Sequence, residues 1–138
     1  SPTFALEEAA DGDEFDLGPI ELRCSATDHP GNTLAFHMSA GEAAIAYSAD
    51  TGLGWSFKEF NAPITLGVCE ASYLDDADTG GLHLSAAQAG NMARDADVPF
   101  LSVTHIVPGQ DRTAIEAAAA DAFGSEVHMA TPRLRFEL

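Results

Sequence analysis

Alternating hydrophobic and polar residues dominate the first half of the chain and have the two-residue period of half-buried β-strands. Gly18-Pro19 and Ala40-Gly41-Glu42 interrupt this alternation, as expected of turns between neighbouring antiparallel strands. The strands predicted from this pattern are residues 15–17, 20–24, 33–39, 43–48 and 65–70, with a short helix at 55–60. The first half is therefore predicted to form β-hairpins.

The second half changes to helices separated by short apolar runs. Ser85 begins a capping box, Ser-Ala-Ala-Gln, which predicts a helix that ends near Asp95. A second helix is expected to begin at Asp111 or Thr113 and to end at Gly124, which permits a left-handed cap. Further strands are predicted at residues 99–104, 127–129 and 134–138. Hairpins followed by strand–helix units predict an α/β layered architecture.

Composition and charge exclude several classes of protein. The 138 residues include 22 Asp and Glu against 6 Lys and Arg, for a net charge of -16, and 46% are hydrophobic, which excludes a disordered acidic tail. Such a surface repels phosphates and anionic lipids, so neither nucleic acid nor a membrane is expected as a partner. The apolar runs, such as residues 98–103, are too short to span a bilayer. We therefore expect a cytoplasmic protein.

The chain is predicted to contain one domain. Residues 1–12 form an acidic N-terminal segment, and no repeat or linker divides residues 13–138. Cys24 and Cys69 lie in strand-like contexts and are expected to be reduced core thiols, because reducing compartments rarely keep disulfides.

Side chains capable of metal binding or acid–base chemistry occur where predicted strands end. His29, Asp50 and His105 each follow a strand, Glu70 ends a strand, and His83 comes just before a helix. Imidazole nitrogens and carboxylate oxygens are donors that zinc prefers, and loops at strand ends are where scaffolds place reactive groups. The spacings are too wide for a zinc-finger motif, so only the fold can bring these residues together.

Structural roles are the alternative for several of these side chains. A loop histidine is often only hydrogen-bonded, and a strand-end carboxylate such as Glu70 alternatively caps nearby backbone amides. His37 and His128 lie within predicted strands beside hydrophobic residues. We expect these two histidines to be ordinary half-buried side chains.

Five segments, in this order, resemble the C-terminal half of a metallo-β-lactamase-fold hydrolase. They are Asp28-His-Pro-Gly31, Tyr47-Ser-Ala-Asp-Thr-Gly52, Val68-Cys-Glu-Ala-Ser72 with Tyr73-Leu-Asp75, Leu82-His-Leu-Ser-Ala86 and Val103-Thr-His105-Ile. The resemblance covers residues 13–138 and is closest to the branch that contains tRNase Z and related phosphodiesterases. It implies an α/β fold that is half of an αββα sandwich, with a mostly antiparallel mixed sheet and helices packed on one face.

The resemblance also implies roles for the five candidate residues. His29 and His105 would each bind one of two divalent metal ions, and Asp50 would bridge them. His83 would donate a proton to the leaving group, oriented by Glu70. The ions would be zinc, or manganese or iron, and would activate water to cleave a phosphodiester or other ester.

Two departures from the family pattern bear on these expectations. Ala49 stands where the family has glycine, so the loop before Asp50 is strained if it needs a positive φ. The family motif His-x-His-x-Asp-His is absent from the 138 residues. His29, Asp50 and His105 alone give neither metal more than two ligands, fewer than the three of an open catalytic zinc site. The chain by itself is therefore expected to bind metal weakly or not at all, and to be inactive.

Two functions of different classes follow from these observations. The first is part of a metal-dependent hydrolase, acting on a small ester or phosphodiester, whose N-terminal half lies outside the sequence; the acidic charge disfavours tRNA. The alternative is a non-catalytic half-domain that acts as an association module. In both cases an uncovered sheet face predicts a homo-oligomer or a complex with the N-terminal half. A His-x-His-x-Asp-His motif encoded upstream of Ser1 would favour the enzyme, and a start codon near Ser1 would favour the module.

Overall fold

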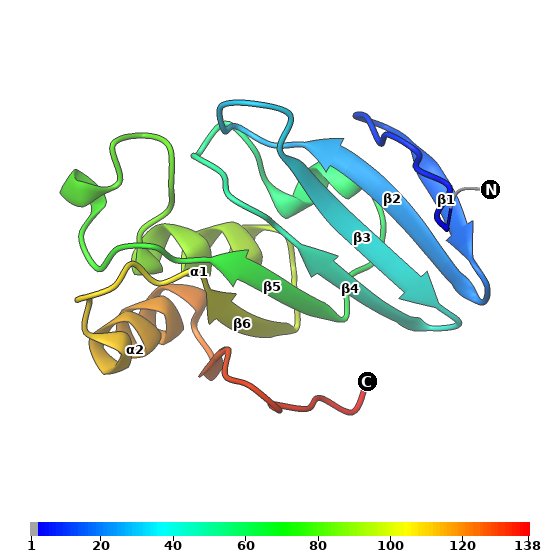
Figure 1. Ribbon diagram of the computed structural model, residues 1–138. Coiled ribbons are helices and arrows are strands. Elements are labelled where there is room, and N and C mark those ends of the chain that lie inside the picture. Colours follow the sequence, from blue (N-terminus) through cyan, green and yellow to red (C-terminus); the bar gives the residue numbers. More distant parts are fainter. Residues whose placement is uncertain (1–2) are drawn as a thin grey trace.

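A seven-stranded mixed sheet forms the centre of the computed structural model, which describes residues 3–138 (Figure 1). The strands lie side by side in sequence order: β1 (Glu14–Leu17), β2 (Ile20–Ala26), β3 (Leu34–Ala40), β4 (Ala43–Tyr47), β5 (Leu66–Glu70), β6 (Phe100–Thr104) and β7 (Val127–Met129). The helices are α1 (Ala86–Asp95) and α2 (Arg112–Phe123), with short 3₁₀ helices η1 (Phe57–Phe60) and η2 (Asp76–Asp78). The first two residues of the predicted acidic segment 1–12 lie outside the described residues.

The pairing between neighbouring strands changes from antiparallel to parallel half-way across the sheet. β1 to β4 pair antiparallel through short connections, whereas β4 to β7 pair parallel. Parallel neighbours need a crossover, and α1 connects β5 to β6 while α2 connects β6 to β7. This arrangement confirms the predicted α/β class and the mixed sheet, but the sheet of residues 3–138 is not mostly antiparallel, because the crossover helices make three of its six strand pairs parallel.

Local signals determine where the helices begin and end. Ser85 caps α1 with the predicted capping box. Asp111 caps α2 by accepting hydrogen bonds from the amides of Thr113 and Ala114. Gly124 ends this helix with a φ of 84°, in the left-handed region that suits glycine. No helix within residues 3–138 is long and apolar enough to cross a membrane.

The strand predicted at residues 134–138 is wrong, because this segment has no regular structure. Pro132 cannot donate a ladder hydrogen bond, and Arg133 has a φ of 72°. The amide of Leu134 bonds the carbonyl of Thr131 in a turn, 3.1 Å away. The turn diverts the chain from the sheet edge after β7.

Helices cover one face of the sheet and form the hydrophobic core with it (Figure 1). Leu101 and Val103 of β6 are fully buried in this core together with Ile115 of α2. At the other end of the sheet the indole of Trp55 donates a hydrogen bond of 3.0 Å to Ser25 Oγ of β2. The core therefore lies on one side of the sheet and extends from β2 to β7.

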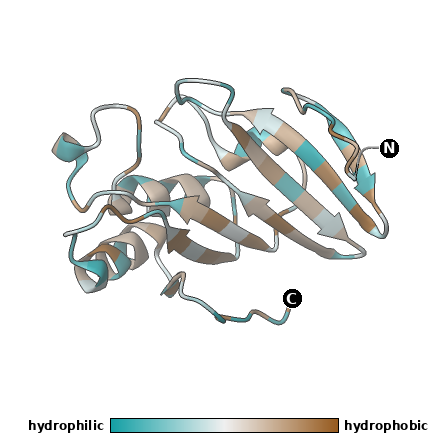
Figure 2. Cartoon of the chain, in the orientation of Figure 1, coloured by the Kyte–Doolittle hydropathy of each residue, from teal (hydrophilic) through white to brown (hydrophobic). Residues whose placement is uncertain are grey.

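The opposite face of the sheet carries a row of half-buried hydrophobic side chains. Directly paired residues point to the same face, and Phe36 pairs with Tyr47, Met38 with Ile45, and Tyr47 with Val68. Figure 2 shows how hydrophobic residues recur along these strands. We call these five residues, all only partly exposed, the open face.

Gly90 of α1 lies at the contact between the two helices. A Cβ there would overlap the carbonyl oxygen of Ala119 and lie 2.9 Å from the amide nitrogen of Phe123. We expect Gly90→Ala to lower the free energy of unfolding by about 1–2 kcal/mol, because overpacking costs more than the helix-propensity gain of roughly 1 kcal/mol. Urea unfolding measures the change, and Ala117→Gly on the exposed side of α2 calibrates the propensity term. A Gly90→Ala protein more stable than the parent would contradict this packing.

Candidate functional site

The five candidate residues converge on one edge of the sheet. His29 follows β2, Asp50 follows β4, Glu70 ends β5, His83 precedes α1, and His105 follows β6. β2 runs antiparallel to β3, and β3 runs antiparallel to β4, so β2, β4, β5 and β6 all point the same way. Their carboxyl ends therefore meet at a single edge, the usual position of a site in an open α/β sheet.

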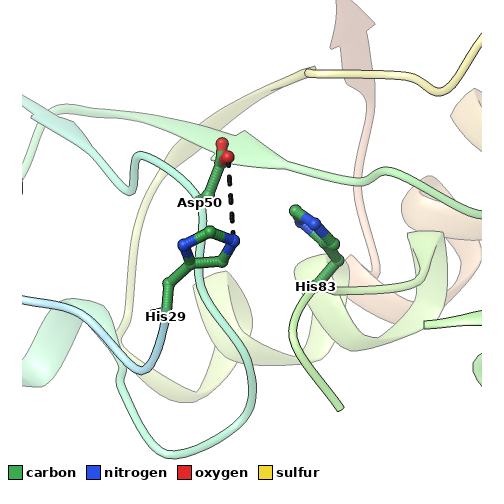
Figure 3. A group of neighbouring side chains, drawn as sticks. All are labelled: His29, Asp50 and His83. Carbon is green, nitrogen blue, oxygen red and sulfur yellow. Dashed lines mark ion pairs between the residues drawn. The ribbon is translucent and has the colours of Figure 1, made fainter. Parts of the chain in front are cut away.

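Asp50 lies between two histidines. Its Oδ2 is 4.0 Å from His29 Nε2, and its Oδ1 is 3.5 Å from His105 Nε2. Figure 3 shows the His29 ring turned toward Asp50, with His83 across the gap. The His83 ring centroid is 5.1 Å from that of His29 and 5.4 Å from that of His105. One carboxylate and three imidazoles thus line a single space.

The loop that presents Asp50 is held by hydrogen bonds and carries backbone strain. Ala49 has a φ of 52°, the left-handed region in which the Cβ costs roughly 1–2 kcal/mol. Thr27 Oγ1 donates to the carbonyl of Asp50 at 2.7 Å, and the amide of Gly52 bonds the carbonyl of Asp28 at 2.8 Å. Alanine therefore occupies a position that does need a positive φ, as the family glycine at this place implies.

The side chain of Asp28 also holds this loop in place. Its Oδ2 accepts a hydrogen bond of 2.8 Å from the amide of Gly54. A Cβ at Gly54 would lie 2.7 Å from this oxygen, and one at Gly52 would overlap the carbonyl oxygen of Gly81. These two glycines allow the close approach that places Asp50 beside His29.

Glu70 is almost completely buried and is surrounded by donors. Its Oε1 lies 2.6 Å from the amide nitrogen of Thr51 and 3.0 Å from His83 Nδ1. Its Oε2 accepts from Ser72 Oγ at 2.7 Å and from the amide of Leu84 at 3.1 Å. Four donors match the acceptor capacity of an ionised carboxylate. Glu70 thus accepts hydrogen bonds both from backbone amides and from His83.

The carboxylates of the site affect neighbouring groups. Burial raises the pKa of Tyr47, and the negative charges of Asp50 and Glu70 raise it further. The pKa of the Cys69 thiol is raised to about 12, mainly by complete burial; a side-chain hydrogen bond with Ser48 opposes this increase, and the negative charge of Glu70 adds to it. Cys69 therefore stays a protonated core thiol, and both cysteines are buried and free as predicted.

The donor atoms fit a divalent metal ion. Among residues 3–138 the carboxylate oxygens of Asp50 accept no hydrogen bond and face the Nε2 atoms of His29 and His105. His29 Nδ1 lies 3.1 Å from the carbonyl oxygen of Pro30 and 3.3 Å from Thr33 Oγ1; in the tautomer that donates from Nδ1 to Pro30, Nε2 keeps its lone pair for a metal ion. Two groups of ligand atoms lie within 4.8 Å of one another: His29, Asp50 and His83; and Glu70, His83 and His105. The carboxylate of Glu70 is already filled with hydrogen bonds, which leaves the Asp50 carboxylate, with the Nε2 atoms of His29 and His105 beside it, as the better place for a metal ion.

The remaining predictions concern histidines outside the site. His37 is buried, and its Nε2 bonds the carbonyl of Pro63 at 2.9 Å. His128 is half-buried, and its ring packs edge-on against Phe136, with centroids 5.5 Å apart. His128 is half-buried as predicted, whereas the prediction of a half-buried His37 is wrong, because that side chain is almost completely buried. Sequence reasoning missed Ser72, which bonds both Glu70 and His105, although it ends a segment that resembles the family.

Comparisons with known proteins agree with this architecture. The chain is similar to the uncharacterized protein Rv1339 of Mycobacterium tuberculosis, with 29% identity over 140 residues that cover all of this chain and 51% of that protein. It is also similar to the probable metallo-hydrolase YhfI of Bacillus subtilis, with 27% identity over 114 residues, or 82% of this chain and 47% of YhfI. The crystal structure of YhfI, a metallo-β-lactamase fold protein, matches with a TM-score of 0.78 and 26% identity, covering 86% of this chain and 49% of that one. The chain has part of the metallo-β-lactamase fold.

The coverage defines how far this likeness extends. The chain spans about half the length of the curated relatives that it matches. The human tRNase Z short form shares this part of the metallo-β-lactamase fold, with a TM-score of 0.61 and 20% identity over 84% of this chain and 41% of that one. No family model matches the chain.

Proposed function

We propose that the chain forms the C-terminal part of a metal-dependent hydrolase. The observation that carries the proposal is the position of the His29 and His105 Nε2 atoms, one against each oxygen of Asp50. This set of donors is the one zinc prefers, and manganese or iron also accept it. Two divalent ions at this place would supply an activated water and polarise the ester to be cleaved.

The residues of the chain perform complementary tasks. His29, Asp50 and His105 would hold the metal ions, and ions at this place would orient the ester above the carboxyl ends of β2, β4 and β6. His83 is proposed to give a proton to the departing alkoxide, since Glu70 bonds its Nδ1 and leaves Nε2 directed at the site. The buried Glu70 fixes the orientation of this ring through the same hydrogen bond.

The substrate is proposed to be a phosphodiester or another small ester. A proton donor beside a metal-holding aspartate suits a reaction in which an alkoxide, a poor leaving group, departs, as in phosphodiester cleavage. The His83–Glu70 pair also supports the branch that contains tRNase Z-like phosphodiesterases. A net charge of -16 disfavours a large polyanion as substrate, because its phosphates would meet a negative surface.

Hydrolysis of bis(p-nitrophenyl) phosphate tests the proposal. The assay compares the chain alone with a protein in which a segment carrying His-x-His-x-Asp-His is joined before it, each with added Zn²⁺ or Mn²⁺. We expect metal-dependent turnover only in the joined protein, because the chain alone offers too few ligands for two ions. Turnover that survives His105→Ala would refute the role of this histidine.

The open face is proposed to bind the rest of the hydrolase or, without it, a second copy of the chain. Its five hydrophobic side chains lie on the side of the sheet opposite to the helices. Contiguous apolar surface of this kind marks an association site. This face also supports the alternative function, a non-catalytic association module, which has the same interface and no turnover.

We expect the chain alone to sediment as an oligomer and Ile45→Lys to shift it toward the monomer. A charged side chain in the middle of the open face must be desolvated when the face is covered, which weakens the association. Analytical ultracentrifugation measures the shift, and Ala117→Lys on the exposed side of α2 is the control. A stable monomer of 14.4 kDa for the parent chain would contradict the prediction.

A further inference from the structure

Ser72 connects the two sides of the candidate site by hydrogen bonds. Its Oγ lies 2.7 Å from Glu70 Oε2 and 2.8 Å from His105 Nδ1. The side chain is completely buried, and the carbonyl of Ser72 accepts a hydrogen bond of 3.1 Å from the amide of Val107. Ser72 is therefore fixed by its surroundings and has no access to water as an alternative partner.

The hydrogen-bonding capacity of the groups determines which way these bonds run. A serine hydroxyl has one hydrogen to donate. The amides of Thr51 and Leu84 donate to both oxygens of Glu70, so this carboxylate acts as an acceptor and takes the hydrogen of Ser72 as well. Ser72 Oγ can then only accept from His105. His105 Nδ1 must carry the hydrogen in this bond.

We propose that Ser72 is a positioning residue that holds His105 in the Nδ1–H tautomer and leaves Nε2 as a lone-pair donor. This Nε2 is the atom that lies 3.5 Å from Asp50 Oδ1. Partners that fix the tautomer and ring orientation of a ligating histidine increase its affinity for metal. The importance of the tautomer for catalysis rests on the proposed hydrolase function, whereas the tautomer itself is a property of the chain.

Glu70 takes part in the orientation of both His83 and His105. Its Oε1 lies 3.0 Å from His83 Nδ1, and its Oε2 receives the hydrogen of Ser72. One buried carboxylate thus orients His83 directly and His105 through a hydroxyl. The backbone of His105, with a φ of 59°, is also held in the left-handed region, so its ring is restrained from both the main chain and Nδ1.

Two-bond ¹H–¹⁵N correlation spectra of the histidine rings test the inference on the 138-residue chain. We expect the Nδ1–H pattern for His105 in the parent, loss of this single-tautomer pattern in Ser72→Ala, and its recovery in Ser72→Thr. Ser102→Ala is the matched control, because it removes a buried hydroxyl of β6 that bonds the carbonyl of His128. The control is expected to leave His105 unchanged.

Titration of the joined protein with Zn²⁺ gives a second measurement. Loss of an outer partner typically lowers metal affinity by roughly 10- to 100-fold, so Ser72→Ala is expected to bind zinc more weakly by this factor than the parent and Ser72→Thr. An Nε2–H tautomer of His105 in the parent, or an Nδ1–H tautomer kept in folded Ser72→Ala, would overturn the inference. The parent spectrum decides the question even if a variant fails to fold. If His105 shows the expected tautomers but the joined protein has no metal-dependent turnover, the hydrolase function is refuted and the inference about Ser72 stands.

Discussion

Asp50→Asn is expected to lower metal-dependent hydrolysis by the joined protein by more than about 100-fold. This exceeds the loss of roughly 10- to 100-fold that follows when a residue hydrogen-bonded to a metal ligand is removed. The aspartate presents one oxygen to each of two histidine Nε2 atoms, and asparagine replaces one of these oxygens by an amide nitrogen that cannot bind metal. The loss of negative charge further weakens the attraction for divalent cations. Turnover of bis(p-nitrophenyl) phosphate with saturating Mn²⁺ measures the effect.

The same substitution is expected to leave the fold unharmed. The Asp50 carboxylate accepts no hydrogen bond among residues 3–138, so the free energy of unfolding should change by no more than about 0.5 kcal/mol. Asp95→Asn is the charge-matched control, because Asp95 lies at the exposed end of α1 and, within residues 3–138, forms an ion pair only with Arg94. Full activity in Asp50→Asn, or an equal loss in Asp95→Asn, would contradict the assigned role.

Glu70→Gln is expected to destabilise the fold by about 3 kcal/mol, since each buried donor left without an acceptor costs 1–3 kcal/mol and charge-assisted bonds are lost as well. Each oxygen of Glu70 receives one backbone amide, from Thr51 or from Leu84. In either orientation the amide group of glutamine faces one of these N–H groups with its own hydrogens. Urea unfolding should show a lower midpoint with an unchanged slope.

Glu116→Gln provides the control for this prediction. The side chain of Glu116 receives a single backbone amide, that of Met129, at 2.7 Å. Glutamine keeps a carbonyl oxygen for one donor, so its rotation preserves the bond and little stability is lost. A Glu70→Gln protein as stable as Glu116→Gln would show that Glu70 does not accept these four hydrogen bonds.

The strands and helix ends could be predicted because their signals are local. Period-2 alternation predicted the hairpins. The capping serine and Gly124 predicted helix ends, because each acts on backbone groups only a few residues away. The false strand at residues 134–138 shows the limit of such signals. Its alternation was genuine, but Pro132 and the left-handed Arg133 turned the segment away from the edge where it would have paired.

Local sequence signals identified only part of the candidate site. Residue type and position at strand ends selected His29, Asp50, Glu70, His83 and His105, and the structure brings all five together at one edge. Ser72 carried no signal of its own, because a serine after a strand is common and its role depends on a partner 33 residues away. The resemblance to a family identified its segment without showing what the hydroxyl does.

The sequence by itself determined the α/β class, most of the strands and the chemical types of the candidate ligands, since these depend on neighbouring residues and on composition. The tertiary structure alone decided that the carboxyl ends of β2, β4, β5 and β6 meet, which residues share Glu70, and which face of the sheet lacks helices. These properties depend on strand order, direction and register across the whole chain. A contact between residues far apart in the sequence, such as Asp50 and His105, has no local pattern that predicts it, because its free energy is realised only when the sheet is complete.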